Sequence, residues 1–168
     1  MDIASFYGFF SATCFTLLGL WWNVVQGHPG WLREDRLRHA VGGVYLAFFL
    51  PALMGLFAQV GGTSTPSFWR ISFVVVALVG LVSTVRLLGL TREGSAATVP
   101  LQAAAAALYL VVGLIGVAPG IVDPLGMTPV QAEALLLIVL IVIAHGLVWE
   151  FMRRTATTDE TTETTQER

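Results

Sequence analysis

The sequence has little charge and almost no cysteine. Charged residues make up 12% of its 168 positions, whereas a soluble domain carries about 25%. This shortage excludes an ordinary soluble domain. The single cysteine, Cys14, lies in an apolar stretch and excludes a disulfide-rich secreted domain. Every cationic side chain is arginine, which suggests a bacterial gene rich in G and C, and no basic patch for nucleic acid occurs.

Motifs of catalytic and cofactor sites are also missing. The three histidines and one cysteine have no metal-ligand spacing, and only His145 lies securely inside an apolar segment, whereas His39 lies at the edge of one. No GxSxG, HExxH or phosphate-binding glycine loop is found. We therefore expect no enzyme and no bound metal or cofactor.

Hydrophobic residues supply 55% of the chain and gather in segments long enough to cross a bilayer, for which a helix needs about 20 apolar residues. The start Met1-Asp2-Ile3 has no positive charge and no cleavage site follows, so we expect the first segment to be retained. The fifth begins with the capping sequence Thr128-Pro129-Val130-Gln131. The sequence predicts an all-α integral membrane domain over residues 1–154, with five transmembrane helices at about 4–26, 40–60, 68–90, 99–118 and 129–152.

Arginine placement predicts the orientation of these helices. Cytoplasmic loops carry an excess of arginine and lysine, and three loops or helix ends on one side hold arginines while the other side has only Arg70. The N-terminus is therefore predicted outside and the C-terminus in the cytoplasm, in the plasma membrane. Four tryptophans then fall at the inner interface and Trp69 at the outer one. The inner-side arginines are Arg33, Arg36, Arg38, Arg92, Arg153 and Arg154.

Two polar segments flank or connect the apolar ones. Residues 28–39 pair Glu34 with Arg38 and Asp35 with His39 at a spacing of four, which predicts a short helix at the headgroups. Residues 155–168 hold seven threonines, four acids and no large apolar residue, which predicts a disordered cytoplasmic tail.

Small and polar residues form stripes on the first and fourth segments. Such stripes mark close helix packing in membranes, within the bundle or between copies of the chain. The first stripe, with its hydroxyls, is alternatively the lining of a narrow polar path. The stripes are Ser5, Gly8, Ala12, Thr16, Gly19 and Asn23, and Gln102, Ala106, Tyr109, Gly113 and Gly116.

Ionisable residues inside membrane segments are costly and are candidates for function. In the inner half lie Asn23, Arg86 and His145, with Glu150 near the edge as a counter-ion for Arg86. These four residues are a candidate gate or proton site, although Arg86 can also extend to the headgroups and His145 can hydrogen-bond to a neighbouring helix.

On the outer side, Arg70 and Glu133 each lie near a helix start and predict a surface salt bridge or, alternatively, a charge pair in a vestibule. Pro51 falls at mid-membrane in the second segment, where it is expected to kink or loosen the helix.

Two functions fit these features. One is a small homo-oligomeric ion or proton channel or transport unit, because it gives the buried polar residues a role. The other is a noncatalytic accessory or scaffold subunit that binds a membrane partner through the small-residue stripes.

Overall fold

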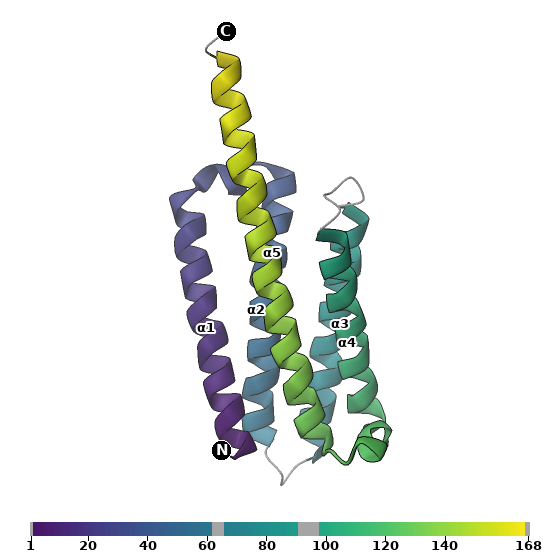
Figure 1. Ribbon diagram of the computed structural model, residues 1–168. Helices are drawn as coiled ribbons and strands as arrows, with labels where there is room; N and C mark the ends of the chain where they lie inside the picture. Colours follow the sequence, from purple (N-terminus) through teal and green to yellow (C-terminus); the bar gives the residue numbers. More distant parts are fainter. Residues whose placement is uncertain (1, 62–65, 91–97, 167–168) are drawn as a thin grey trace.

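The computed structural model describes residues 2–61, 66–90 and 98–166, and these residues form helices without a strand (Figure 1). Five helices are long and apolar enough to cross a membrane, which confirms the predicted all-helical class and the number of long apolar helices. Membrane insertion and orientation stay predictions. The loop residues 62–65 and 91–97, among them Arg92, lie outside the described part of the chain. The long helices are α1 (Ile3–Gly27), α2 (Asp35–Gly61), α3 (Pro66–Leu90), α4 (Thr98–Val117) and α5 (Pro129–Gln166).

Side-chain caps fix two helix starts. Asp2 accepts a hydrogen bond from the backbone N–H of Ala4 at 2.7 Å and begins α1. At α5, the backbone N–H of Thr128 donates to Gln131 Oε1 at 3.0 Å and that of Gln131 donates to Thr128 Oγ1 at 3.3 Å. This reciprocal pair confirms the predicted capping box.

The connector after α1 is helical, as predicted, but its helix from Asp35 onward is continuous with α2. It contains the short 3₁₀ helix η1 (Pro29–Leu32), and α2 begins at Asp35, five residues before the predicted 40. Asp35 pairs with Arg38 at 2.8 Å, three residues away, and its carbonyl contacts His39 Nδ1 at 2.6 Å. The predicted Glu34–Arg38 and Asp35–His39 side-chain pairs are therefore replaced by contacts of Asp35, within one continuous helix.

The end of α5 also differs from the prediction. The helix continues to Gln166, so the backbone of residues 155–166 is helical where the composition predicts disorder. Figure 1 shows this part of α5 projecting beyond the other helices. The segment lacks the proline or glycine that would end a helix after Gly146.

Four helices form a ring and α1 lies outside it. α2 packs on α3, α3 on α4, α4 on α5, and α5 back on α2, while α1 packs mainly on α2. α2 continues through Pro51, and Ser11 Oγ of α1 donates to the carbonyl of Ala52 at 3.1 Å. A Cβ added at Gly55 would overlap Ser11 Oγ. The absence of a side chain at Gly55 thus lets α1 approach α2 closely.

The two ends of the bundle carry different elements. One end, named here the arginine-rich end, holds η1, the start of α2, the end of α3 and the start of α4. The opposite end holds the N-terminus, the end of α2 and the 3₁₀ helix η2 (Pro119–Leu125). Under the arginine-based prediction, the arginine-rich end faces the cytoplasm.

Aromatic residues fill the junction of α1, η1 and α5 near the arginine-rich end. Trp21 and Trp31 stack with centroids 6.4 Å apart, and both contact the ring of Phe151. Both tryptophans are buried, whereas Trp22 and Trp149 are exposed. Two of the four tryptophans predicted at the inner interface therefore serve as core residues.

Candidate functional site

A cavity of about 800 Å³ lies within the ring of α2, α3, α4 and α5. Apolar side chains form most of its wall, and Trp31 of η1 contributes at the arginine-rich end. Cavities of about 300–1,000 Å³ with apolar walls and a few polar groups are typical small-molecule sites. We name it the α2–α5 cavity.

The cavity extends from the arginine-rich end to the middle of the bundle. Its lining on α2 reaches from Asp35 to Leu50, a helical distance of about 22 Å. The hydrocarbon core of a bilayer is about 30 Å thick, so in the predicted membrane setting such a cavity would be a half-channel that ends at mid-depth.

Tyr109 of α4 forms the cavity floor together with Leu50 of α2 and Leu140 of α5. All three are at least nine-tenths buried. The Tyr109 ring lies against Gly80 of α3, where an added Cβ would come within 2.6 Å of the ring. The position of the floor therefore depends on a glycine.

Polar groups line the cavity above this floor. Gln102 is buried, Ser83 lines the wall, and Thr84 Oγ1 donates to the carbonyl of Gly80 at 2.8 Å. Gln102 and Tyr109 belong to the stripe predicted on the fourth segment. Gly113, from the same stripe, packs on α3, where an added Cβ would lie 3.7 Å from the Cβ of Ala77. This stripe thus serves both as cavity lining and as a packing seam.

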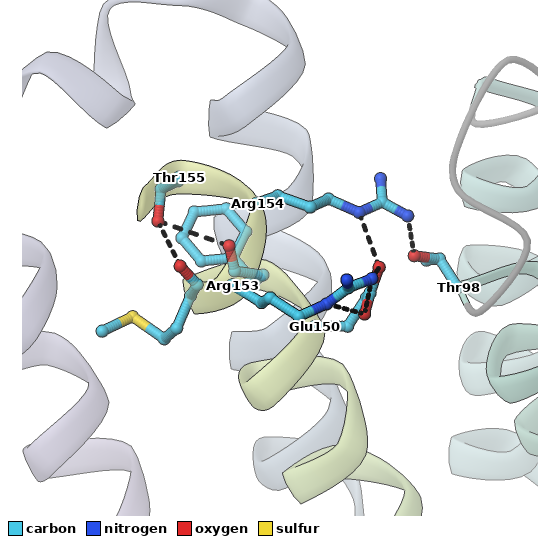
Figure 2. A network of polar contacts seen from close by, with 7 residues as sticks. Thr98, Glu150, Arg153, Arg154 and Thr155 are labelled. Carbon is cyan, nitrogen blue, oxygen red and sulfur yellow. Dashed lines mark hydrogen bonds and ion pairs between the residues drawn. The ribbon is translucent and has the colours of Figure 1, made fainter. Parts of the chain in front are cut away.

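A cluster of charged side chains joins α5 to α4 at the cavity mouth (Figure 2). Glu150 accepts hydrogen bonds from Arg153 at 3.0 and 3.1 Å and from Arg154 Nε at 3.0 Å. Arg154 Nη2 also donates to Thr98 Oγ1 of α4. The Glu150 side chain is 7% exposed, and two guanidinium groups compensate the charge that burial would otherwise penalise.

These pairings differ from the predicted one. Glu150 binds two arginines of its own helix, in place of the predicted Arg86. The physical reason is proximity, since residues three and four positions apart on a helix are neighbours. The sequence predicts only a cytoplasmic position for Arg153 and Arg154, but their spacing of three and four residues from Glu150 is a signal that identifies the cluster.

The other predicted gate residues lie on the outer surface of the bundle. Asn23, Arg86 and His145 are exposed, on α1, α3 and α5. His145 Nδ1 contacts the carbonyl of Ile141 in its own helix at 2.9 Å, and its ring lies edge-on to Phe48 of α2. The structure therefore does not gather these three residues around the cavity.

Most of the polar stripe of α1 faces away from the ring, except Gly8, where an added Cβ would lie 3.3 Å from Gln59 Oε1 of α2. Ser5, Thr16 and Gly19 are exposed, and Thr16 Oγ1 donates to the carbonyl of Ala12 in its own helix at 2.9 Å. The face of α1 that packs on the bundle carries mostly large apolar residues, together with Ser11 and Cys14. They are Tyr7, Phe10, Ser11, Cys14, Leu18, Trp21 and Val25.

At the opposite end, the predicted pair of Arg70 and Glu133 is wrong. Arg70 donates to the carbonyls of Gly116 and Val117 at 2.9 and 2.8 Å, the terminal carbonyls of α4 that lack partners within that helix. Glu133 is 0% exposed, and within the described part of the chain neither of its carboxyl oxygens has a hydrogen-bond partner. The rotation of α5 places this side chain inside the bundle, away from the surface.

Comparison of the chain with protein-family models, with curated proteins and with solved structures finds no match.

Proposed function

We propose that this chain is a small membrane transport protein of the carrier type, with the α2–α5 cavity as its substrate site. The observation that supports this proposal is the shape of the cavity, which opens at one end of the bundle and stops at its middle. A carrier that alternates access between the two sides of a membrane has such a half-channel when it faces one side.

The walls of the cavity favour a largely apolar substrate with a hydrogen-bonding group. Apolar side chains predominate, and Gln102, Thr84 and Tyr109 supply a small number of polar groups. Apolar burial would then provide affinity and the polar groups would orient the molecule. The mouth carries both signs of charge, so we propose no charge requirement for the substrate. These charged residues are Glu34, Asp35, Arg36 and Arg154.

Pro51 gives α2 a suitable place to bend during transport. It directly follows the floor residue Leu50, and proline removes one backbone hydrogen bond from a helix. We propose that α2 bends here when the opposite half of the bundle opens. Asn23, Arg86 and His145 have no part in this mechanism, in contrast to the gate that the sequence suggests.

Cysteine accessibility tests alternating access without knowledge of the substrate. Leu140→Cys is placed in a Cys14→Ser background in oriented liposomes, and a membrane-impermeant thiol reagent is added to one side at a time. We expect modification from the arginine-rich side, through the cavity, and slower modification from the opposite side. Val142→Cys, on an exposed apolar surface of the same helix, is the control and stays unmodified from both sides.

If Leu140→Cys reacts from the arginine-rich side alone under all conditions, the carrier proposal is rejected and a binding cavity remains. The orientation is read in the same liposomes from Gly30→Cys in η1 and Ile121→Cys in η2, two exposed positions at opposite ends of the bundle. Modification of both from one side would contradict the predicted topology.

Photolabelling tests whether the cavity binds small apolar molecules. An uncharged phenyldiazirine probe should label cavity residues such as Leu147, and Ala105→Phe, which fills the cavity from α4, should abolish that labelling. Ala103→Phe makes the same change on the exposed face of α4 and should leave it intact. Equal labelling in both variants would mean that the probe reaches Leu147 from the surrounding lipid.

The outward stripe of α1 favours an additional role in self-association. Small residues on an exposed helix face allow a second helix to approach closely in lipid, and Ser5, Ala12, Thr16 and Gly19 are all exposed. We propose that α1 mediates a homo-oligomer through this face. The accessory or scaffold alternative would use the same face to bind a different membrane protein.

A further inference from the structure

Glu133 is an acidic residue whose side chain is fully buried in the bundle. It lies four residues after Pro129, the first residue of α5, and is 0% exposed. Among the residues that the structure describes, neither carboxyl oxygen has a hydrogen-bond partner. An isolated carboxylate in an apolar interior is strongly disfavoured, and such a group takes up a proton instead.

The described charged and titratable groups around Glu133 offer no compensation. On α1, Tyr7 lies close enough to interact with the charge of Glu133, but its hydroxyl donates to the carbonyl of Val130 at 2.8 Å. On α3, Arg70 is bound to the carbonyls that end α4. Within the same half of the bundle, α2 has no titratable residue over 50–61, α4 has only Tyr109 at the cavity floor, and η2 has the exposed Asp123.

Glu133 is also aligned with the cavity. Leu140 follows it by seven residues, so both lie on one face of α5, about 20° apart, with Glu133 about 10 Å farther from the arginine-rich end. Leu137, which is 0% exposed, lies between them. The side chain thus occupies the continuation of the half-channel beyond its floor, in the half that a carrier must open.

We propose that Glu133 is a proton-binding site, which holds a proton while this half of the bundle is closed and releases it when the half opens to water. The release of this proton on opening rests on the proposed carrier function. Opening would hydrate the carboxylate, so proton release and access from the opposite side would be thermodynamically linked.

Infrared spectroscopy tests the bound proton independently of transport. At pH 7 the purified protein should show the carbonyl band of a protonated carboxyl group, and the isosteric variant Glu133→Gln should lose it. Glu150→Gln is the matched control on the same helix, because Glu150 is paired with two arginines and should contribute no such band. Absence of the band in folded wild-type protein, or its persistence in Glu133→Gln, overturns the proposal.

The link to opening is tested with Leu140→Cys. Its rate of modification from the opposite side is divided by its rate from the arginine-rich side at the same pH, which removes the ionisation of the thiol itself. This ratio should increase with pH by up to about tenfold per pH unit, the limit for release of one proton. Adding Glu133→Gln should make this ratio of rates independent of pH. The same pH dependence in the Glu133→Gln variant would overturn the proposed proton release. If Leu140→Cys is not modified from the opposite side at any pH, the carrier proposal is rejected. The infrared result then decides by itself whether Glu133 binds a proton.

Discussion

The two halves of the bundle differ in the size of the side chains that the same helices place in the interior. In the half near the arginine-rich end, many residues that line the cavity are small, and four charged residues gather at its mouth. In the opposite half, aromatic side chains pack edge to face, as Phe73 does with Tyr7 and with Trp69. Side-chain size, more than helix arrangement, therefore decides where the interior is open. The small lining residues are Ala40, Gly43, Ala47, Gly80, Ala105 and Ala144.

The largest expected effect comes from shortening one leucine in each half. Leu137→Ala should lower the free energy of unfolding by about 2–5 kcal/mol, because it creates a new cavity in a filled interior. Leu147→Ala, on the same helix, only enlarges an existing cavity and should cost about 1 kcal/mol or less. Reversible unfolding in mixed micelles measures both values. Equal losses would mean that the two halves do not differ in packing.

The next effect concerns the cavity floor. Gly80→Ala forces the Tyr109 ring to move, with an expected loss of about 1–3 kcal/mol from overpacking. At Gly89 on the same helix an added Cβ meets no described atom within 4 Å, and Gly89→Ala should be neutral or stabilise by up to about 1 kcal/mol. The same unfolding assay compares the two variants. A harmless Gly80→Ala would show that Tyr109 does not depend on this glycine.

A smaller effect is expected at the mouth. Glu150→Gln weakens the link from α5 to α4 and should cost about 1 kcal/mol, since both arginines can turn toward water. It should also accelerate modification of Leu147→Cys from the arginine-rich side. Asp35→Asn breaks the exposed Asp35–Arg38 pair and should cost only a few tenths of a kcal/mol. Similar losses in the two variants would contradict a distinct contribution from the buried cluster.

The smallest effect on the stability of the fold is expected from Gly19→Leu, which should instead weaken the assembly of the chain into oligomers. An added Cβ at Gly19 meets no described atom within 4 Å, so the monomer should keep its stability while the oligomeric fraction in liposomes decreases. Gly113→Leu should instead destabilise the monomer, because Gly113 faces Ala77 of α3 at close range. Single-molecule photobleaching gives the number of chains per particle. A wild-type protein that is monomeric at every protein-to-lipid ratio would contradict the assembly proposal.

The helices could be predicted from the sequence because each depends on local signals. Hydropathy over about 20 residues, turn residues between segments and the Thr128–Gln131 capping box all act within a few positions. The start of α2 at Asp35 could not be predicted in this way, because the charge of residues 35–39 argues against placing them in the membrane. Helix formation and membrane depth are separate properties, and α2 can extend past the bilayer.

The site could not be predicted because it depends on the rotation of each helix. Composition shows that Glu133, Arg86 and Glu150 are ionisable, but not which of them turns inward. The structure buries Glu133 and exposes Arg86, the reverse of the predicted arrangement. The cavity is still less visible in sequence, since it is the space that four separate helices leave between them.

The hydrogen bond from Tyr7 to Val130 joins residues 123 positions apart, in the first and last helices. During synthesis, α1 leaves the ribosome long before α5, so the Tyr7 hydroxyl lacks this acceptor until the final helix has been inserted. The contact between α1 and the start of α5 therefore forms only after α5 has been synthesised, and Glu133 reaches its buried position in that same step.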